Sequence, residues 1–267
     1  MAKIIVITSG KGGVGKTTTT ANLGVALANL GYSTVLIDAD VGLRNLDLLL
    51  GLENRIIYTA SDVLLGECSL EQALIKDKRQ SKLYLLPASQ NRTKDVLTSH
   101  DMNQLVNLLK DKHDYILIDS PAGIETGFFS AIKPAREAII VTTPEITAVR
   151  DADRVIGLLE ASGFEKISLL LNRLRPKMVK ANNMMSIDDV KEILSIPLLG
   201  VIPEDEIVIV STNRGEPLVL NQDFSLAKLA FENTSRRLVG ETVAFLDFDR
   251  TYRLHFNRIK NFFSTIK

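Results

Sequence analysis

Short apolar runs recur along the chain and alternate with longer stretches whose apolar positions have helical spacing. The runs are nearly continuous in Ile, Val and Leu, which is typical of strands buried on both faces of a parallel sheet. They predict strands at 3–8, 34–38, 83–87, 115–119, 138–142, 168–172 and 198–202. The longer stretches predict helices at 16–30, 99–112, 147–161, 186–194 and 224–238. This βαβα order predicts an α/β fold: a single doubly wound, mostly parallel sheet flanked by helices.

The pattern changes after about residue 240, so we expect a main domain at 1–240 and a connector with a C-terminal amphipathic helix at 241–267. In the tail, large apolar residues spaced four, three, four and three apart fall on one helical face, with a further Phe at its edge. These are Tyr252, Phe256, Ile259, Phe263 and Ile266, and the edge residue is Phe262. The flanking basic residues, Arg253, Lys260 and Lys267, could reach phosphates. The pattern alone fits a membrane-surface or partner-binding helix, and equally a helix packed on the protein's own core.

Composition narrows the class of protein. Of the 267 residues, 45% are hydrophobic and 24% charged, which excludes a disordered chain, a collagen-like chain or a coiled-coil rod. The 32 basic and 32 acidic residues cancel, so no whole-molecule field favours nucleic acid or an anionic membrane. Residues 250–267 carry five basic residues and no acid, which leaves 27 basic and 32 acidic residues, a net charge of −5, before them. The neutral total therefore combines an acidic body with a basic tail.

Residue usage also excludes several chemistries. Cys68 is the single cysteine, so neither an intramolecular disulfide nor a multi-cysteine metal site can form within one chain. The three histidines are scattered, which argues against a histidine metal site. We expect no transmembrane helix, because no run of about 18 apolar residues occurs. The first residues already resemble a strand, so we expect no signal or transit peptide and a reducing, cytoplasmic compartment.

A glycine-rich segment between the first predicted strand and helix has the spacing G-x-x-x-x-G-K-[ST], with Gly10, Gly15, Lys16 and Thr17 at the fixed positions. Glycines allow backbone N–H groups to surround phosphate oxygens, and the following helix N-terminus favours anions. Lys16 can reach the β- and γ-phosphates, and the Thr17 hydroxyl can bind Mg²⁺. The segment predicts a nucleotide site that comprises Gly10, Lys11, Gly12, Gly13, Val14, Gly15, Lys16, Thr17 and Thr18.

Acidic residues end two of the predicted strands. Asp38 and Asp40 follow one apolar run, and Asp119 ends another. The carboxyl ends of parallel strands line the crevice where open α/β sheets bind ligands. Asp119 fits a Walker B acid that holds Mg²⁺ or its waters. A helix N-cap or a turn is the alternative explanation for these acids.

The segment 10–17, GKGGVGKT, resembles the deviant Walker A signature of the MinD/ParA group of P-loop ATPases. The resemblance covers about residues 2–240 and includes 41–47, 72–77, 85–90, 119–125, 149–154, 200–205 and 213–217, which are similar to septum-site-determining members of the group. It implies ATP and Mg²⁺ as cofactors, ATP hydrolysis, and a homodimer in the ATP-bound state. ATP hydrolysis would then determine how long the dimer persists.

The resemblance also implies roles for individual residues. The catalytic residues would be Lys11, Lys16 and Asp40. Lys11 would reach the partner subunit's nucleotide, and Asp40 would position the attacking water. Asp38 would lie on the Mg²⁺ side, with Thr17 and Asp119 as the other metal-site residues. The Gly123 backbone would sense the γ-phosphate. The residues implied around adenine are Asn172, Arg173, Pro203 and Asp205, although ordinary strand-end turns would also explain them.

For partners, the resemblance implies a MinC-like division inhibitor and a MinE-like topological regulator. Arg150, Asp151 and Asp153 are the candidate surface, with a solvated helix face as the alternative. The resemblance also favours the membrane interpretation of the tail. The expected location is cytoplasmic and peripheral on the inner face of the cell membrane, or the stroma and inner envelope of a plastid. No specific nucleic acid is expected.

Other classes of protein with the same phosphate loop fit the sequence less well. A chromosome- or plasmid-partition ATPase that binds DNA in its ATP state is the nearest one, but the neutral charge argues against it. A reductase like the nitrogenase iron protein needs more cluster cysteines than Cys68 supplies. A flagellar-number regulator typically has a helix ahead of the first strand, whereas only Met1 and Ala2 precede the strand here. No acceptor pocket of a small-molecule kinase is indicated.

Overall fold

The computed structural model describes residues 1–40, 45–88 and 97–248. Its centre is an eight-stranded sheet in the order β3-β4-β2-β5-β1-β6-β7-β8. The strands are β1 (Lys3–Thr8), β2 (Thr34–Asp38), β3 (Ile75–Lys76), β4 (Leu83–Leu86), β5 (Tyr115–Asp119), β6 (Glu137–Thr142), β7 (Lys166–Leu174) and β8 (Leu198–Pro203). Neighbours pair in parallel, except that the edge strand β3 runs antiparallel to β4. The predicted mostly parallel sheet is confirmed.

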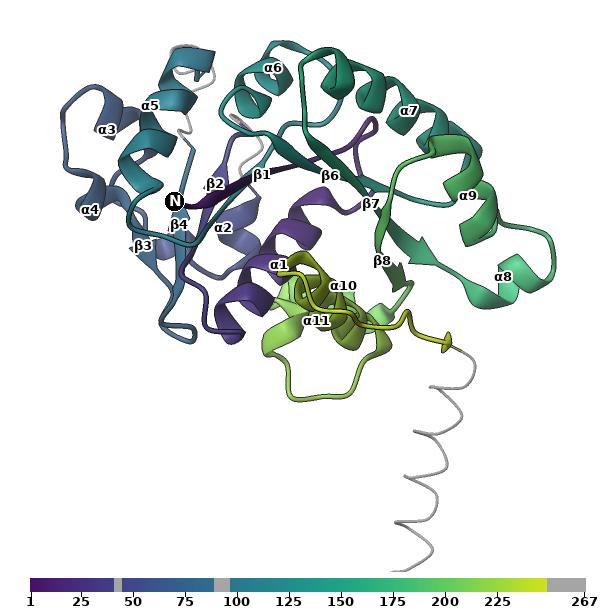
Figure 1. Ribbon diagram of the computed structural model, residues 1–267. Helices are drawn as coiled ribbons and strands as arrows, with labels where there is room; N and C mark the ends of the chain where they lie inside the picture. Colours follow the sequence, from purple (N-terminus) through teal and green to yellow (C-terminus); the bar gives the residue numbers. More distant parts are fainter. Residues whose placement is uncertain (41–44, 89–96, 249–267) are drawn as a thin grey trace, which may run out of the picture.

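Helices cover both faces of the sheet (Figure 1). On one face lie α5 (Ser99–Leu109), α6 (Thr126–Ile132), α7 (Ile146–Ala161) and α9 (Ile187–Leu194). On the other lie α1 (Lys16–Asn29), α2 (Leu46–Leu49) and α11 (Leu226–Leu238). The remaining short helices are α3 (Ala60–Leu64), α4 (Leu70–Ala73), α8 (Pro176–Lys180) and α10 (Glu206–Asn213), with 3₁₀ turns η1 (Glu53–Arg55) and η2 (Leu218–Leu220).

The strand side chains supply two separate cores because successive residues point to opposite faces. In β5, Ile116 and Ile118 pack under α5, α6 and α7, whereas Leu117 packs under α1 and α11. All three side chains are fully buried. Burial on both faces explains why these strands are continuous apolar runs.

Helix ends follow local sequence signals where those are present. Thr98 caps α5, its hydroxyl accepting from the Asp101 N–H at 3.2 Å, and Ser186 caps α9 in the same way through Asp189 at 3.1 Å. In each case the acid reaches back to the backbone N–H of the capping residue. These reciprocal bonds satisfy donors that the first turn of a helix leaves open.

The predicted strands and long helices are all present, with ends that differ by a few residues. The prediction lacks β3 and the helices α2, α3, α4, α6, α8 and α10. Most of these elements have too few residues to show a periodic pattern. The tail residues Tyr252, Phe256, Ile259, Phe262, Phe263 and Ile266, with Arg253, Lys260 and Lys267, lie outside the described residues. The proposed boundary at residue 240 stays a prediction.

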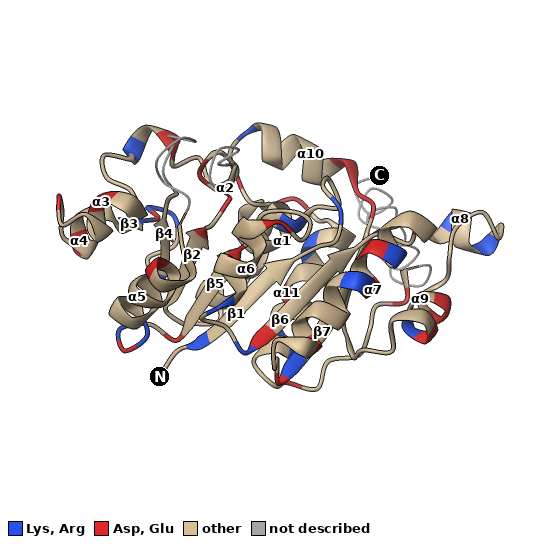
Figure 2. Ribbon diagram, turned by 90° about the horizontal axis from the view of Figure 1, so that it is seen from above, with Lys and Arg blue, Asp and Glu red and all other residues tan. Residues whose placement is uncertain are grey.

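Charges in the described chain lie mainly on helices and connecting loops, while the strands are mostly free of them (Figure 2). Basic and acidic residues are interspersed on α7 and α9 in this view. No helix of the described chain is long and apolar enough to cross a membrane. Nor do the described residues contain a cluster of three or more His, Cys, Asp or Glu suited to a metal ion.

Candidate functional site

The phosphate loop connects the central strand β1 to α1, at the end of the sheet where the parallel strands terminate. The Ser9 hydroxyl donates to the Lys11 carbonyl at 3.0 Å and so helps to shape the loop. Gly15 lies at the N-cap of α1 with φ 93°, and its carbonyl accepts the first helical bond, from Thr19 N–H, at 2.9 Å. The loop therefore ends in the open N-terminus of a 14-residue helix, which favours an anion.

Two loop glycines are required for different physical reasons. Gly15 has a left-handed conformation that a side chain would strain. Gly10 lies against the backbone of α7, and a Cβ there would come within 2.2 Å of the Asp151 carbonyl oxygen. Gly12, by contrast, has open space where its Cβ would be. The fixed glycines of the motif thus let the loop lie close to α7 and turn into α1.

Lys16 and Asp119 form a buried ion pair beneath the loop. The Lys16 Nζ lies 3.1 Å from the Asp119 Oδ1, and the two side chains are 7% and 1% exposed. The Thr20 hydroxyl lies 3.1 Å from the same carboxylate oxygen. Because Thr20 is fully buried one turn after Lys16, α1 supplies two groups that hold this acid. Sequence analysis missed Thr20, although its four-residue spacing from Lys16 places both on one helix face.

Asp38 lies beside this pair because β2 and β5 are neighbours with Asp38 opposite Asp119. Burial and, next, the Asp119 charge raise the pKa of Asp38 to about 8. Backbone N–H groups of Asp40 and Leu46 oppose that rise by donating to its carboxylate at 3.0 and 3.4 Å. Two carboxylates that share a buried site with one lysine resist simultaneous ionisation.

The oxygen donors at this position fit Mg²⁺. Thr17, half-buried on the first turn of α1, adds a hydroxyl to the carboxylates of Asp38 and Asp119. Mg²⁺ usually takes one or two carboxylates and completes its shell with water and phosphate oxygens. The three predicted metal-site residues are therefore of the right chemistry.

Lys11 and Asp40 lie at the edge of the site. The Lys11 Nζ is 3.3 Å from the Thr147 Oγ1 in an exposed contact with the first turn of α7, away from the Lys16–Asp119 pair. Asp40 is half-buried and lines a cavity of about 340 Å³ together with residues of the loop after β5, including Pro121. Thr147 was not predicted, and its contact depends on folding rather than on a sequence motif.

Gly123 also contacts the phosphate loop. Its backbone N–H donates to the Ser9 carbonyl at 3.2 Å, and its φ of 85° requires the freedom of glycine. The segment after β5 is therefore joined directly to the segment after β1. Its predicted phosphate-sensing role stays a prediction.

The four predicted adenine residues fall in different surroundings. The Asn172 Nδ2 donates to the Val14 carbonyl at 2.8 Å, so this residue contacts the phosphate loop itself. Arg173 is exposed, with a left-handed φ of 56°. Pro203 is buried at the end of β8. Asp205 caps α10 by accepting from Ile207 N–H at 3.0 Å, and its other carboxylate oxygen accepts from the Ser225 hydroxyl at 2.7 Å.

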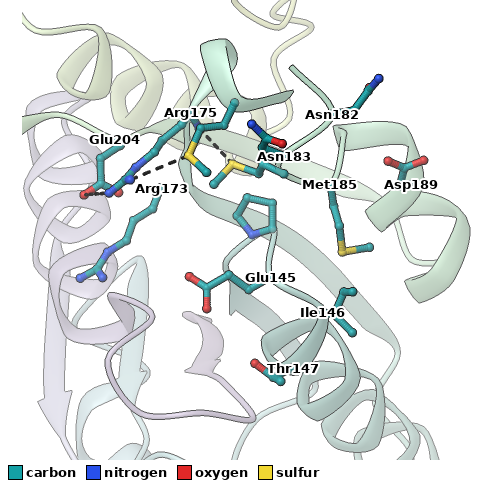
Figure 3. Close-up of a pocket in the computed structure, with 13 residues that line it drawn as sticks. Glu145, Ile146, Thr147, Arg173, Arg175, Asn182, Asn183, Met185, Asp189 and Glu204 are labelled. Carbon is teal, nitrogen blue, oxygen red and sulfur yellow. Dashed lines mark hydrogen bonds and ion pairs between the residues drawn. The ribbon is translucent and has the colours of Figure 1, made fainter. Parts of the chain in front are cut away.

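Arg173 lines an open pocket of about 730 Å³ beside the loop (Figure 3). Glu145, Ile146 and Thr147 at the start of α7 form one wall, and the segment after β7 forms the other. At one end of the pocket, the Arg175 Nη2 lies 3.9 Å from the Glu204 Oε1. The pocket is thus continuous with the surface on which Lys11 rests.

The candidate partner residues lie farther along α7. Arg150 and Asp153 are exposed, whereas Asp151 is half-buried, forms an ion pair with Arg154 at 3.7 Å, and presents its carbonyl to Gly10. A solvated face explains the charged side chains as well as a partner does, so their role stays a prediction.

Comparison with known proteins identifies the family. A model described as the CobQ/CobB/MinD/ParA nucleotide binding domain matches residues 5–218. The chain belongs to this MinD/ParA family. It is 71% identical over 263 residues to a putative septum site-determining protein MinD of Guillardia theta, covering 98% of each chain.

Solved structures of the MinD/ParA family give the same assignment. A MinC:MinD cell division protein complex of Aquifex aeolicus matches with a TM-score of 0.85 and 51% identity, over 91% of this chain and 98% of that one. A septum site-determining MinD of Pyrococcus horikoshii, complexed with Mg-ADP, matches with a TM-score of 0.81 and 34% identity, over 90% and 97%. The predicted family and its nucleotide-binding fold are confirmed.

Proposed function

We propose that the chain is a Mg-ATP-dependent ATPase of division-site placement that dimerises when it binds ATP. The observation that carries this proposal is the buried group of Lys16, Asp38 and Asp119 directly beneath a phosphate loop. A lysine for phosphate and acids for Mg²⁺ are the parts that phosphoryl transfer requires. The Mg-ADP complex of the Pyrococcus horikoshii relative supports the same nucleotide chemistry.

The chain's own residues then act mainly by positioning charge. Backbone N–H groups of the loop and the N-terminus of α1 receive the phosphates, and Lys16 moves from Asp119 to the phosphate oxygens. Thr17, Asp38 and Asp119 would hold Mg²⁺, directly or through water. When bound, Mg²⁺ neutralises charge that develops on the phosphate oxygens. Asp40 would orient the attacking water.

Lys11 would act across a dimer interface. It already lies on the surface, on Thr147 rather than among the buried groups, so it is free to leave without exposing a buried charge. Lys11→Ala should therefore bind Mg-ATP but not dimerise, as measured by light scattering. A dimer of unchanged stability in this variant would refute the role of Lys11.

Membrane attachment would depend on dimerisation. Apolar side chains contribute about 1.5–3 kcal/mol each on burial, but ordering the tail costs about 1–2 kcal/mol per residue, so one tail binds weakly. Two tails on one dimer gain effective concentration. We propose a cytoplasmic chain that binds the inner face of a membrane in its ATP state, or a stromal chain in a plastid, and that is released by hydrolysis.

The membrane-bound dimer would recruit a division inhibitor. The MinC:MinD complex of the Aquifex aeolicus relative supports a MinC-like partner. A MinE-like regulator is proposed only from the family resemblance. Arg150, Asp151 and Asp153 on α7 are the residues to substitute first.

Sedimentation with anionic liposomes tests nucleotide, dimer and tail together. The full chain should pellet with Mg-ATP and stay in the supernatant with Mg-ADP. A chain that lacks 250–267 should bind Mg-ATP equally well but not pellet. Pelleting of the truncated chain would refute the role of the tail. ATP-dependent binding to DNA in the same assay, without liposome binding, would favour a partition ATPase instead.

A further inference from the structure

The Asn172 side chain is a feature of the site that the proposed chemistry does not use. It is 7% exposed at the end of β7, and its Nδ2 lies 2.8 Å from the Val14 carbonyl oxygen in a buried hydrogen bond between residues far apart in the chain. Only the amide nitrogen can approach a carbonyl in this way, because the amide oxygen would face another acceptor. The orientation of the Asn172 amide is therefore fixed by its partner.

The same amide also touches the next residue of the loop. A Cβ added to Gly15 would lie 2.3 Å from the Asn172 Nδ2, so the amide occupies the space beside the Gly15 Cα. Asn172 thus binds the carbonyl of the peptide that joins Val14 to Gly15 and lies beside the Gly15 Cα. Burying an amide without a partner is costly, so this contact is maintained in the folded chain.

The direction of this peptide matters for phosphate binding. A trans peptide is planar, and its C=O and N–H point in opposite directions. Because the Val14 carbonyl points at Asn172, the Gly15 N–H points away from Asn172. Gly15 is the N-cap of α1, where a backbone N–H can meet an anion. A rotated Val14–Gly15 peptide would present a carbonyl oxygen to the phosphates instead.

We propose that Asn172 is a positioning residue for the phosphate loop, which it holds in the anion-binding orientation through the Val14 carbonyl. This role is separate from contact with the base, and it leaves the acceptor oxygen of the amide to serve adenine. The inference rests on the proposed nucleotide site, but it concerns the phosphate end of that site. It predicts that Asn172 affects ligands that have no base at all.

The test compares Mg-ATP with Mg-tripolyphosphate, which carries phosphates but no base or ribose. Binding to the full chain is measured by calorimetry for wild type, Asn172→Ala and Asn172→Asp. We expect Asn172→Ala to weaken tripolyphosphate binding about tenfold, the range of one buried hydrogen bond. Asn172→Asp should weaken it more, because a carboxylate would repel both the Val14 carbonyl and the phosphates.

The control is Asn233→Ala on α11, which removes an asparagine of similar burial, 9% exposed against 7%. It should leave tripolyphosphate binding unchanged. The Gly15 amide resonance in the ¹⁵N NMR spectrum gives a second measurement that needs no ligand, and it should shift in both Asn172 variants. If Asn172→Ala will not fold, the Gly15 amide resonance of the isosteric Asn172→Asp carries the test, because no phosphate is present to be repelled.

The outcomes separate this inference from the proposed function. Wild type that binds ATP and tripolyphosphate, with Asn172 variants that lose affinity for ATP alone, would overturn the positioning role and leave Asn172 as a base contact. Unchanged binding of both ligands would overturn it as well. Wild type that binds neither ligand would overturn the proposed nucleotide site itself.

Discussion

Replacing Lys16 by methionine should lower the free energy of unfolding, because it breaks the buried ion pair with Asp119. The substitution keeps most of the side-chain volume, so it removes the charge with little change in packing. It leaves Asp119 at 1% exposure, without its cation and opposite Asp38 in the neighbouring strand. Removing one partner of a buried pair costs about 3–5 kcal/mol because the other charge stays buried.

The loss should be confined to the buried pair, because solvent screens an exposed one. At pH 7 the free energy of unfolding of Lys16→Met should be lower than that of the wild type by about 3–5 kcal/mol.

The assay is urea unfolding with EDTA and without nucleotide, followed by far-ultraviolet circular dichroism because the chain has no tryptophan. The matched control is Lys112→Met, which removes the lysine of an exposed pair with Glu71, the two being 60% and 66% exposed. An exposed pair contributes little to stability because solvent screens it, so the control should change the free energy of unfolding little. A loss in Lys16→Met no larger than the loss in Lys112→Met would refute the reasoning.

Three further predictions follow from the site. The pKa of Asp38 is about 8 in the folded chain and lower in the unfolded chain, so the cost of burying this acid is small near pH 4 and grows as the pH rises to 8. In urea unfolding, the stability of Asp38→Asn relative to wild type should therefore increase between pH 5 and 8, by at most about 4 kcal/mol. A difference that stays constant over this range would contradict the prediction. Gly10→Ala should lower the melting temperature and abolish ATP binding, because its Cβ would meet the Asp151 carbonyl at 2.2 Å, whereas Gly12→Ala, with no protein atom near its Cβ, should leave the melting temperature close to unchanged. Asp40→Ala should retain Mg-ATP binding by calorimetry but lose phosphate release, and full turnover would exclude its role in positioning water.

The sequence predicted much of the fold because its signals are local. Continuous apolar runs indicated the buried strands, and the glycine-lysine motif marked the loop and the start of α1. Short elements such as β3 and α4 escaped prediction, because two to four residues carry no measurable period. Nor does any local signal say that β3 joins the edge of the sheet antiparallel to β4.

Within the site, the sequence by itself determined which chemical groups are available: a phosphate loop, two lysines, and acids at strand ends. Only the tertiary structure decided how they pair. Lys16 meets Asp119 because β5 lies next to β1, and Asn172 reaches Val14 because β7 ends on the same side of the sheet. Such contacts join residues more than 100 positions apart, so they depend on strand order, which periodicity and turn chemistry do not encode.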